Sequence, residues 1–306
     1  MALRELTFPL LPRRRLVGLA FGAMHSARRG TGSDVAGSRP YIAGDDVDAI
    51  DWAASARLSA ARDSDQFVVR ERFAEEAPRV VVVCDRRPEP SAPDLPWLRK
   101  AEAMQTVAEL VAESTTKARG FVGYLDLAES DAEPFWRPPG SHGEVWAIEA
   151  RRLAAPTSAA PADGVARSLD FLAGHRRSVP AGSFVFVLSD FLVPPPRATW
   201  ARAVELRWDI VPVVIQDPVW EQSFPSVDGV VVPFAAAHGR VRLVRLTREE
   251  ALERRRANEE RLRALLADCR TLGIEPILIS RNDAEHVFQA FLGWADERRF
   301  VRRQLS

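Results

Sequence analysis

Two carboxylates that end strand-like runs are the side chains of this sequence with the clearest chemical potential. Asp85 follows the apolar run 79–84, and Asp190 follows the run 183–189. Ligands of open α/β sheets bind beyond the carboxyl ends of the strands, and Mg²⁺ or Mn²⁺ is held there by carboxylate oxygens. The pair is a candidate metal site, and a metal-bound water would make the protein a divalent-metal-dependent hydrolase. The competing interpretation, favoured because only two ligands are visible, is that each acid accepts backbone N–H bonds of the next loop.

Other catalytic patterns are missing from the sequence. The five histidines have no metal-ligand spacing, and neither a Gly-Lys-Ser/Thr phosphate loop nor a Gly-x-Ser-x-Gly elbow occurs. We therefore assign no catalytic residue and predict a non-enzymatic protein.

Glycines, paired acids, arginines and aromatic residues are concentrated in the segment 28–57. Aromatic and arginine side chains dominate interface hot spots, so this segment is a candidate protein-interaction surface. Its candidate residues are Arg39, Tyr41, Asp45, Asp46, Asp51, Trp52 and Arg57. The alternative is structural: Val47, Ile50 and Trp52 would pack onto the sheet, while Arg39 and Arg57 would neutralise the acids in an internal network.

Composition excludes several classes of protein. The 306 residues carry 42 basic and 42 acidic side chains, so no global field steers the chain to nucleic acid. Two cysteines, Cys84 and Cys269, are too few for a disulfide framework and read as buried thiols. The basic start and the apolar stretch 16–24 imitate a secretory signal, but two glycines and a poor cleavage site argue against one. No run reaches the length of a membrane span, so the expected location is cytoplasmic.

From residue 79 onward, strand-like and helix-like segments alternate, as in a parallel sheet with helices on both faces. Apolar runs predict strands at 79–85, 120–127, 183–190, 209–215 and 274–279. Apolar spacing predicts helices along 97–111 and 200–208, a short helix near 144–153, a long helix opened by a Thr247/Glu250 capping box and ended by Gly273, and a terminal helix capped by Asn282. Two short β segments, 230–234 and 240–246, predict a hairpin within an insertion at about 216–246.

Residues 1–78 lack this alternation. Their best helix signal is 44–52, with Asp45 as the N-cap, and their best strand signal is 67–73. We predict an α/β fold, doubly wound around a mostly parallel sheet, divided into an irregular N-terminal segment (1–78) and an α/β domain with a β-hairpin insertion (79–306).

The N-terminal segment also carries a series of short motifs in a fixed order. They are Arg29-Gly30-Thr31-Gly32-Ser33-Asp34, Arg39-Pro40-Tyr41-Ile42-Ala43-Gly44-Asp45-Asp46-Val47, Ile50-Asp51-Trp52, Ala56-Arg57 and Val69-Arg70-Glu71. Their order and spacing resemble the signature of the domain-of-unknown-function 58 family, and the resemblance extends more weakly to the end of the chain.

The resemblance implies a divergent von Willebrand factor type A domain of Rossmann-like architecture. It also implies a partner, a MoxR-type AAA ATPase or its client, in the assembly or activation of other proteins. The chain looks like the soluble subgroup of that family. The metal motif of type A domains, Asp-x-Ser-x-Ser, is degenerate here because Arg87 and Glu89 take the serine places after Asp85, although Asp190 matches the later acid. Asp48 stands where family members usually carry a basic residue.

Overall fold

The computed structural model describes residues 6–13, 24–42, 45–86, 99–127, 133–140, 160–235 and 241–304. Its centre is a six-stranded sheet in the order β10-β7-β6-β3-β4-β5, parallel except for β5, which pairs antiparallel with β4. This is the doubly wound, Rossmann-like order, and it confirms the predicted fold class. The strands are β3 Arg79–Cys84, β4 Phe121–Asp126, β5 Phe135–Gly140, β6 Phe184–Ser189, β7 Asp209–Ile215 and β10 Ile277–Ile279.

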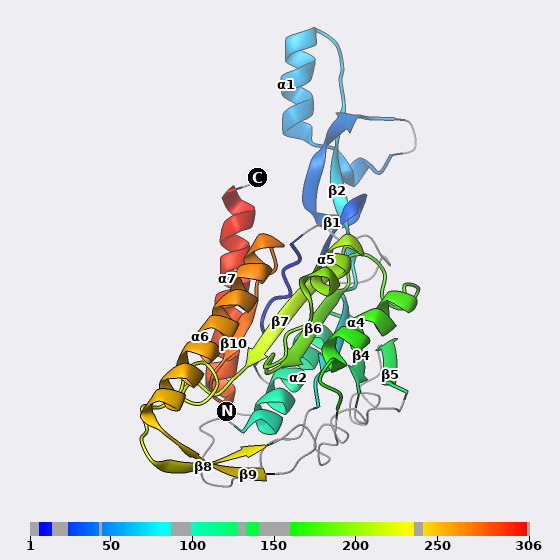
Figure 1. Cartoon of the computed structure of the whole chain (residues 1–306). Coiled ribbons are helices and arrows are strands. Elements are labelled where there is room, and N and C mark those ends of the chain that lie inside the picture. Colours follow the sequence, from blue (N-terminus) through cyan, green and yellow to red (C-terminus); the bar gives the residue numbers. More distant parts are fainter. Residues whose placement is uncertain are drawn as a thin grey trace.

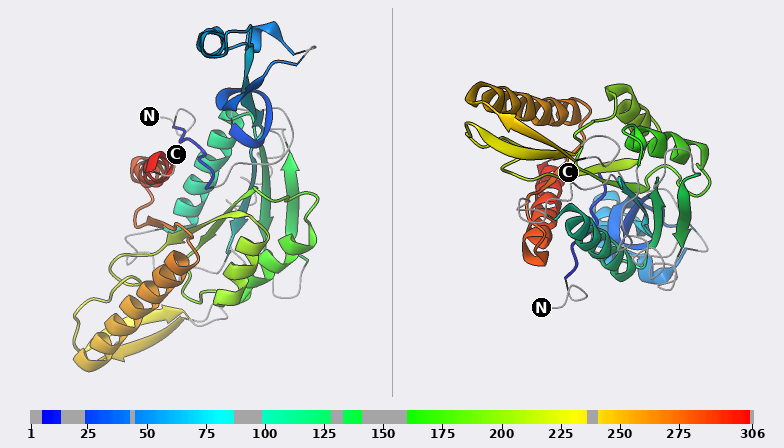
Figure 2. Two further views of the ribbon diagram at one scale, coloured as in Figure 1. Left: turned by 90° about the horizontal axis from the view of Figure 1, so that it is seen from above. Right: turned by 60° about the horizontal axis from the view of Figure 1, so that its bottom comes forward.

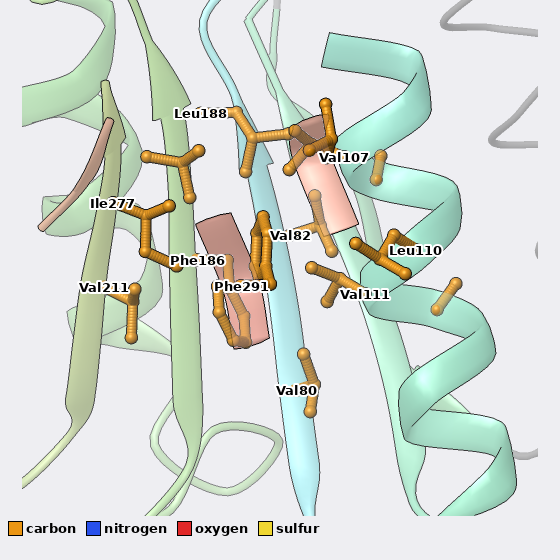
Figure 3. Close-up of a cluster of buried hydrophobic side chains, with 14 of the residues drawn as sticks. Val80, Val82, Val107, Leu110, Val111, Phe186, Leu188, Val211, Ile277 and Phe291 are labelled. Atoms are coloured by element: carbon orange, nitrogen blue, oxygen red, sulfur yellow. The ribbon is translucent and has the colours of Figure 1, made fainter. Parts of the chain in front are cut away.

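Alternating side chains of the central strands build two cores, one on each face of the sheet. Val80 and Val82 of β3 point to a core shared with α2 (Lys100–Lys117) and α7 (Ala284–Gln304). Figure 3 shows Phe186 and Phe291 meeting in this core beside the Val107 and Val111 side chains of α2. The opposite core lies under α4 (Gly164–Gly174), α5 (Arg197–Glu205) and α6 (Arg248–Thr271). Burial on both faces explains why β3 is a continuous β-branched run.

An arm, residues 24–42 and 45–76, stands away from this body at the amino end of the sheet (Figure 1). It consists of the antiparallel ribbon β1 (Met24–Pro40) and β2 (Val68–Glu76), the 3₁₀ turn η2 (Val47–Ala49) and α1 (Trp52–Arg62). The predicted helix over 44–52 was wrong, and so was Asp45 as its cap. Asp46 caps η2 and Asp51 caps α1, because the Asp45 carboxylate is held by Arg39 instead.

The predicted hairpin is confirmed as β8 (Val230–Ala235) and β9 (Val241–Leu246). It packs beside α6 through Phe224, Val232, Leu246 and Ala251, away from the central sheet (Figure 2). The capping box that opens α6 is also confirmed, since Thr247 and Glu250 bond each other's backbone N–H groups. Gly273 follows this helix with a φ of 62°, a left-handed conformation that glycine adopts without strain.

Several local predictions need correction or fall outside the description. The α7 N-terminus is held by Asp283, which accepts the His286 N–H at 2.9 Å, while the Asn282 amide bonds Glu102. Strand β5 and helix α4 were not predicted.

Two predictions lie outside the described residues: the helix near 144–153, and the places of Arg87 and Glu89. None of the described helices is long and apolar enough to cross a membrane.

The predicted boundary at residue 78 falls between β2 and β3. Residues 6–13 nevertheless belong to the core of the α/β body. Leu6, Phe8 and Leu10 are buried there, and the Phe8 ring lies 4.7 Å from that of Phe291. The first part of the chain thus contributes to both the body and the arm.

Candidate functional site

The arm exposes a group of large apolar side chains near the end of β1, the start of α1 and the start of β2. Ile42, Val47, Trp52 and Phe67 are 63%, 58%, 60% and 46% exposed. The Phe67 ring makes edge contacts with Tyr41 at 6.4 Å and with Trp52 at 6.1 Å, so the three rings form one surface, here called the arm patch (Tyr41, Trp52 and Phe67). Exposed apolar side chains that gather in this way mark interaction surfaces more often than isolated ones do.

A bidentate ion pair holds the loop that carries Tyr41. Both terminal nitrogens of Arg39 donate to Asp45, each at 2.6 Å, and the Ile42 N–H donates to the same carboxylate at 2.8 Å. These hydrogen bonds, that of Arg39 above all, lower the pKa of Asp45 to about 2. Charge-assisted bonds therefore tie Ile42 and Asp45 to Arg39 although Ile42 is exposed.

Asp51 and Ser55 fix Trp52 at the start of α1. The Asp51 carboxylate accepts the Ala54 N–H at 3.0 Å and the Arg70 Nε at 2.8 Å, and the bond from Arg70 is the main reason why its pKa falls to about 2. Buried Ser55 accepts the Val68 N–H at 2.9 Å and donates to the Asp51 carbonyl at 2.7 Å. The helix is thus joined to β2 by side chain–backbone bonds.

The structure brings the predicted interaction residues together on the arm, and the alternative interpretation was right that Arg39 neutralises one of the acids. Arg39 and Asp45 pair with each other, Asp46 caps η2 and Asp51 caps α1. The alternative that Trp52 packs onto the sheet was wrong, since more than half of its surface is exposed. Arg57 was also expected to neutralise the acids; it is exposed on α1, and Arg70 of β2 pairs with Asp51 in its place.

Sequence reasoning missed Ile42, Phe67 and Arg70 as members of this surface. Phe67 is the first residue of the predicted strand 67–73, but it lies just before β2, where its ring contacts Tyr41 and Trp52. The only available signal was its closeness to the motif at 69–71, which also contains Arg70.

The second candidate location is the carboxyl edge of the sheet, where Asp85 and Asp190 lie. Asp85 follows β3 and accepts the Ser189 hydroxyl at 2.6 Å, and that hydroxyl in turn accepts the Phe191 N–H at 2.9 Å. Asp190 follows β6 and accepts the Leu192 N–H at 3.0 Å. Both acids therefore order the turn after β6, and for Asp190 this is the backbone-bonding role of the competing interpretation.

Lys100, the first residue of α2, was not identified from the sequence and enters this edge. Its ammonium donates to Asp190 at 2.9 Å and also to Glu221, at the start of the insertion. Burial opposes the charge on Lys100, but the two carboxylates outweigh it and raise its pKa. Burial also raises the pKa of Glu221, against the effect of Lys100. The group is a mostly buried ion triad, with side-chain exposures of only 12–17%.

The arm patch and the carboxyl edge lie at opposite ends of the sheet. Strand β2 of the arm ends at Glu76, three residues before β3 begins at Arg79, whereas Asp85 follows the other end of β3. Six residues at about 3.3 Å each separate the ends of β3 by roughly 20 Å. One small ligand or partner surface cannot cover both locations, so the arm patch and the carboxyl edge are treated as separate candidate sites.

Comparison with known proteins identifies a family. The family model described as "Protein of unknown function DUF58" matches residues 37–264, which include most of the arm and most of the α/β body. No curated protein matches the chain. Among solved structures, the chain is similar to that of the conserved hypothetical protein BatB from Bacteroides thetaiotaomicron. That likeness has 10% identity and a TM-score of 0.38, covers 72% of this chain and 99% of that one, and is too distant to bear on function.

Proposed function

Because the chain belongs to the DUF58 family of proteins of unknown function, we propose a role that depends on its own surface: a non-enzymatic interaction module that binds a protein partner through its arm. The observation that carries this proposal is the arm patch, three contacting rings of which Trp52 is 60% exposed and Phe67 46% exposed. In the described part of the chain, about half of each of these two side chains stays exposed. A partner that covered them would bury much apolar surface.

The polar contacts around the patch support a binding role over a purely structural one. Arg39–Asp45 and Asp51–Arg70 restrain the backbone on both sides of the rings, so binding would cost little ordering entropy. Aromatic anchors on a fixed backbone are typical of interface hot spots. Exposed Asp46 and Asp48 lie beside Val47 and would favour a partner with basic side chains around an apolar centre.

The partner that we propose is a MoxR-type AAA ATPase or one of its clients, with the module acting in the assembly or activation of other proteins. This choice rests on the resemblance of the arm motifs to their family signature. The carboxyl edge is not needed for this contact, because it lies at the other end of the sheet.

The test is direct binding between the purified protein and a MoxR-type AAA ATPase from the same organism. We expect Trp52→Ala to weaken binding about ten-fold or more, as truncation of a hot-spot aromatic does. Phe300→Ala is the matched control, since Phe300 is 63% exposed but lies on α7. Equal binding by the wild type and both variants would remove the arm patch as the contact surface.

Capture from a native lysate extends the same test to clients. A tagged wild-type protein should retain the ATPase or a client, and the Trp52→Ala variant should lose it. A partner retained equally by Trp52→Ala and Arg39→Gln would place its binding surface elsewhere.

A further inference from the structure

The carboxyl edge holds a cation of its own. We propose that the ammonium of Lys100 takes the position of a divalent metal ion at the edge predicted for Mg²⁺ or Mn²⁺, and that this edge works without a metal. The ammonium lies 2.9 Å from Asp190 and contacts Glu221. It therefore joins α2, the end of β6 and the start of the insertion, which is the linking role that a metal with ligands from three segments would have.

Every carboxylate oxygen of this triad is already engaged. The two oxygens of Asp190 accept from Leu192 N–H at 3.0 Å and from Lys100. The two oxygens of Glu221 accept from Asp217 N–H at 2.9 Å and from Lys100. A metal ion would have to displace Lys100 to reach either acid from the same side. Asp190 and Glu221 therefore do not fit a divalent ion while Lys100 lies between them.

The local charge is balanced as well. Asp190 and Glu221 contribute two negative charges, Lys100 one positive charge, and the Arg261 guanidinium donates to the Glu221 carbonyl at 2.8 Å. Lys100 and the nearby Arg261 thus offset the negative charges of Asp190 and Glu221, which weakens their attraction for Mg²⁺ or Mn²⁺. Among the described residues, no group of three or more His, Cys, Asp or Glu side chains is placed to hold a metal ion.

The type of residue agrees with this role. The chain has only two lysines, Lys100 and Lys117, although it carries 42 basic side chains. An ammonium is a compact point charge that can approach two carboxylates at once, whereas the planar guanidinium of arginine is wider and directional. Burial opposes the charge on Lys100, and the two acids keep it charged by raising its pKa.

The small number of lysines makes a sharp experiment possible. Protein labelled with ¹³C only in lysine gives two Cε signals in a heteronuclear spectrum, one from Lys100 and one from exposed Lys117, which serves as the internal reference. We expect millimolar Mn²⁺ to broaden the two signals to the same small extent. Loss of the Lys100 signal alone would show that Mn²⁺ binds near Lys100, whether or not the ion displaces its side chain. That result would overturn the proposal.

Substitutions of the two lysines test whether Lys100 keeps metal ions out. Lys100→Met removes the ammonium at similar side-chain length and leaves Asp190 and Glu221 without it, so we expect its Mn²⁺ affinity to rise at least ten-fold over wild type. Lys117→Met should remain at the wild-type level, and Asp190→Asn added to Lys100→Met should abolish the gain. Wild-type affinity equal to or above that of Lys100→Met would overturn the proposal. If Lys100→Met does not fold, the lysine-labelled wild type still decides it.

Discussion

Single side chains of the arm are held by charge more than by burial. Asp45 is the clearest case, because its carboxylate accepts three hydrogen bonds, two of them from Arg39. Its pKa of about 2 lies below the ordinary value of 3.8. A carboxyl whose folded pKa is depressed stabilises the fold above its unfolded pKa and loses that contribution as the pH falls through the folded value. The loop around Tyr41 should therefore loosen between about pH 4 and pH 2.

This effect gives a prediction at Arg39. In the Arg39→Gln variant the pKa of Asp45 should rise from about 2 towards 3.8, because its strongest hydrogen-bond donor is gone. Carboxyl-carbon NMR measured against pH follows this one group. Arg57→Gln is the control, since Asp51 and Asp45 pair with other arginines. An Asp45 pKa that is equal in wild type and Arg39→Gln would show that the ion pair does not form in solution.

The cysteines give a second prediction about individual side chains. Cys84 and Cys269 are free and buried, as their places in the sequence predicted. Burial raises the pKa of both thiols, that of Cys269 to about 11. The thiolate is the reactive form, so neither should react with a disulfide reagent at pH 8 in the native protein, and both should react in denaturant. Rapid reaction of one thiol in the native state would contradict their placement.

Among the elements, α1 depends on its bonds to β2. Ser55→Ala removes the hydroxyl that accepts the Val68 N–H, and an unsatisfied buried donor costs about 1–3 kcal/mol. Hydrogen exchange at the Val68 amide should accelerate accordingly, while exchange in β3 stays unchanged.

Ser64→Ala is the matched control for this measurement. The exposed Ser64 hydroxyl accepts the Gln66 side-chain amide at 3.3 Å and not the Val68 N–H, so exchange at Val68 should remain at the wild-type rate. If Ser55→Ala exchanged as slowly as this control, α1 would be held by other contacts.

The whole molecule depends on residues 6–13, which pack in the core far from their neighbours in sequence. Phe8 is buried and its ring contacts Phe186, Phe291 and Trp294. Phe8→Ala should lower the free energy of unfolding by about 3–5 kcal/mol, as other buried Phe→Ala changes do. Urea denaturation measures this loss.

A Phe→Ala change at an exposed position shows whether the loss of stability comes from burial or only from the loss of a phenylalanine. Phe300→Ala on α7 should change the free energy of unfolding by no more than about 0.5 kcal/mol. Trp52→Ala should behave in the same way, because Trp52 contributes to the arm patch and not to either core. A small effect of Phe8→Ala would mean that residues 6–13 do not pack as described.

The sequence by itself determined the parts of the molecule that are encoded within a few neighbouring residues. β3 followed from a run of β-branched residues, α6 from its capping box, the hairpin from two short β segments, and the doubly wound sheet from the alternation of these signals. The concentration of arginines and aromatics in 28–57 likewise pointed to the arm. Periodicity and capping are local properties, so sequence alone can reveal them.

Only the tertiary structure decided which distant side chains meet. Lys100 pairs with residues 90 and 121 positions away, and Asp51 pairs with Arg70 in place of Arg57. Phe67 joins Trp52 across the arm, and Phe8 reaches a core built almost entirely from later residues. Such contacts carry no local pattern, because they arise where strands and helices bring remote segments together. For the same reason, only the fold could separate the arm patch and the carboxyl edge to opposite ends of the sheet.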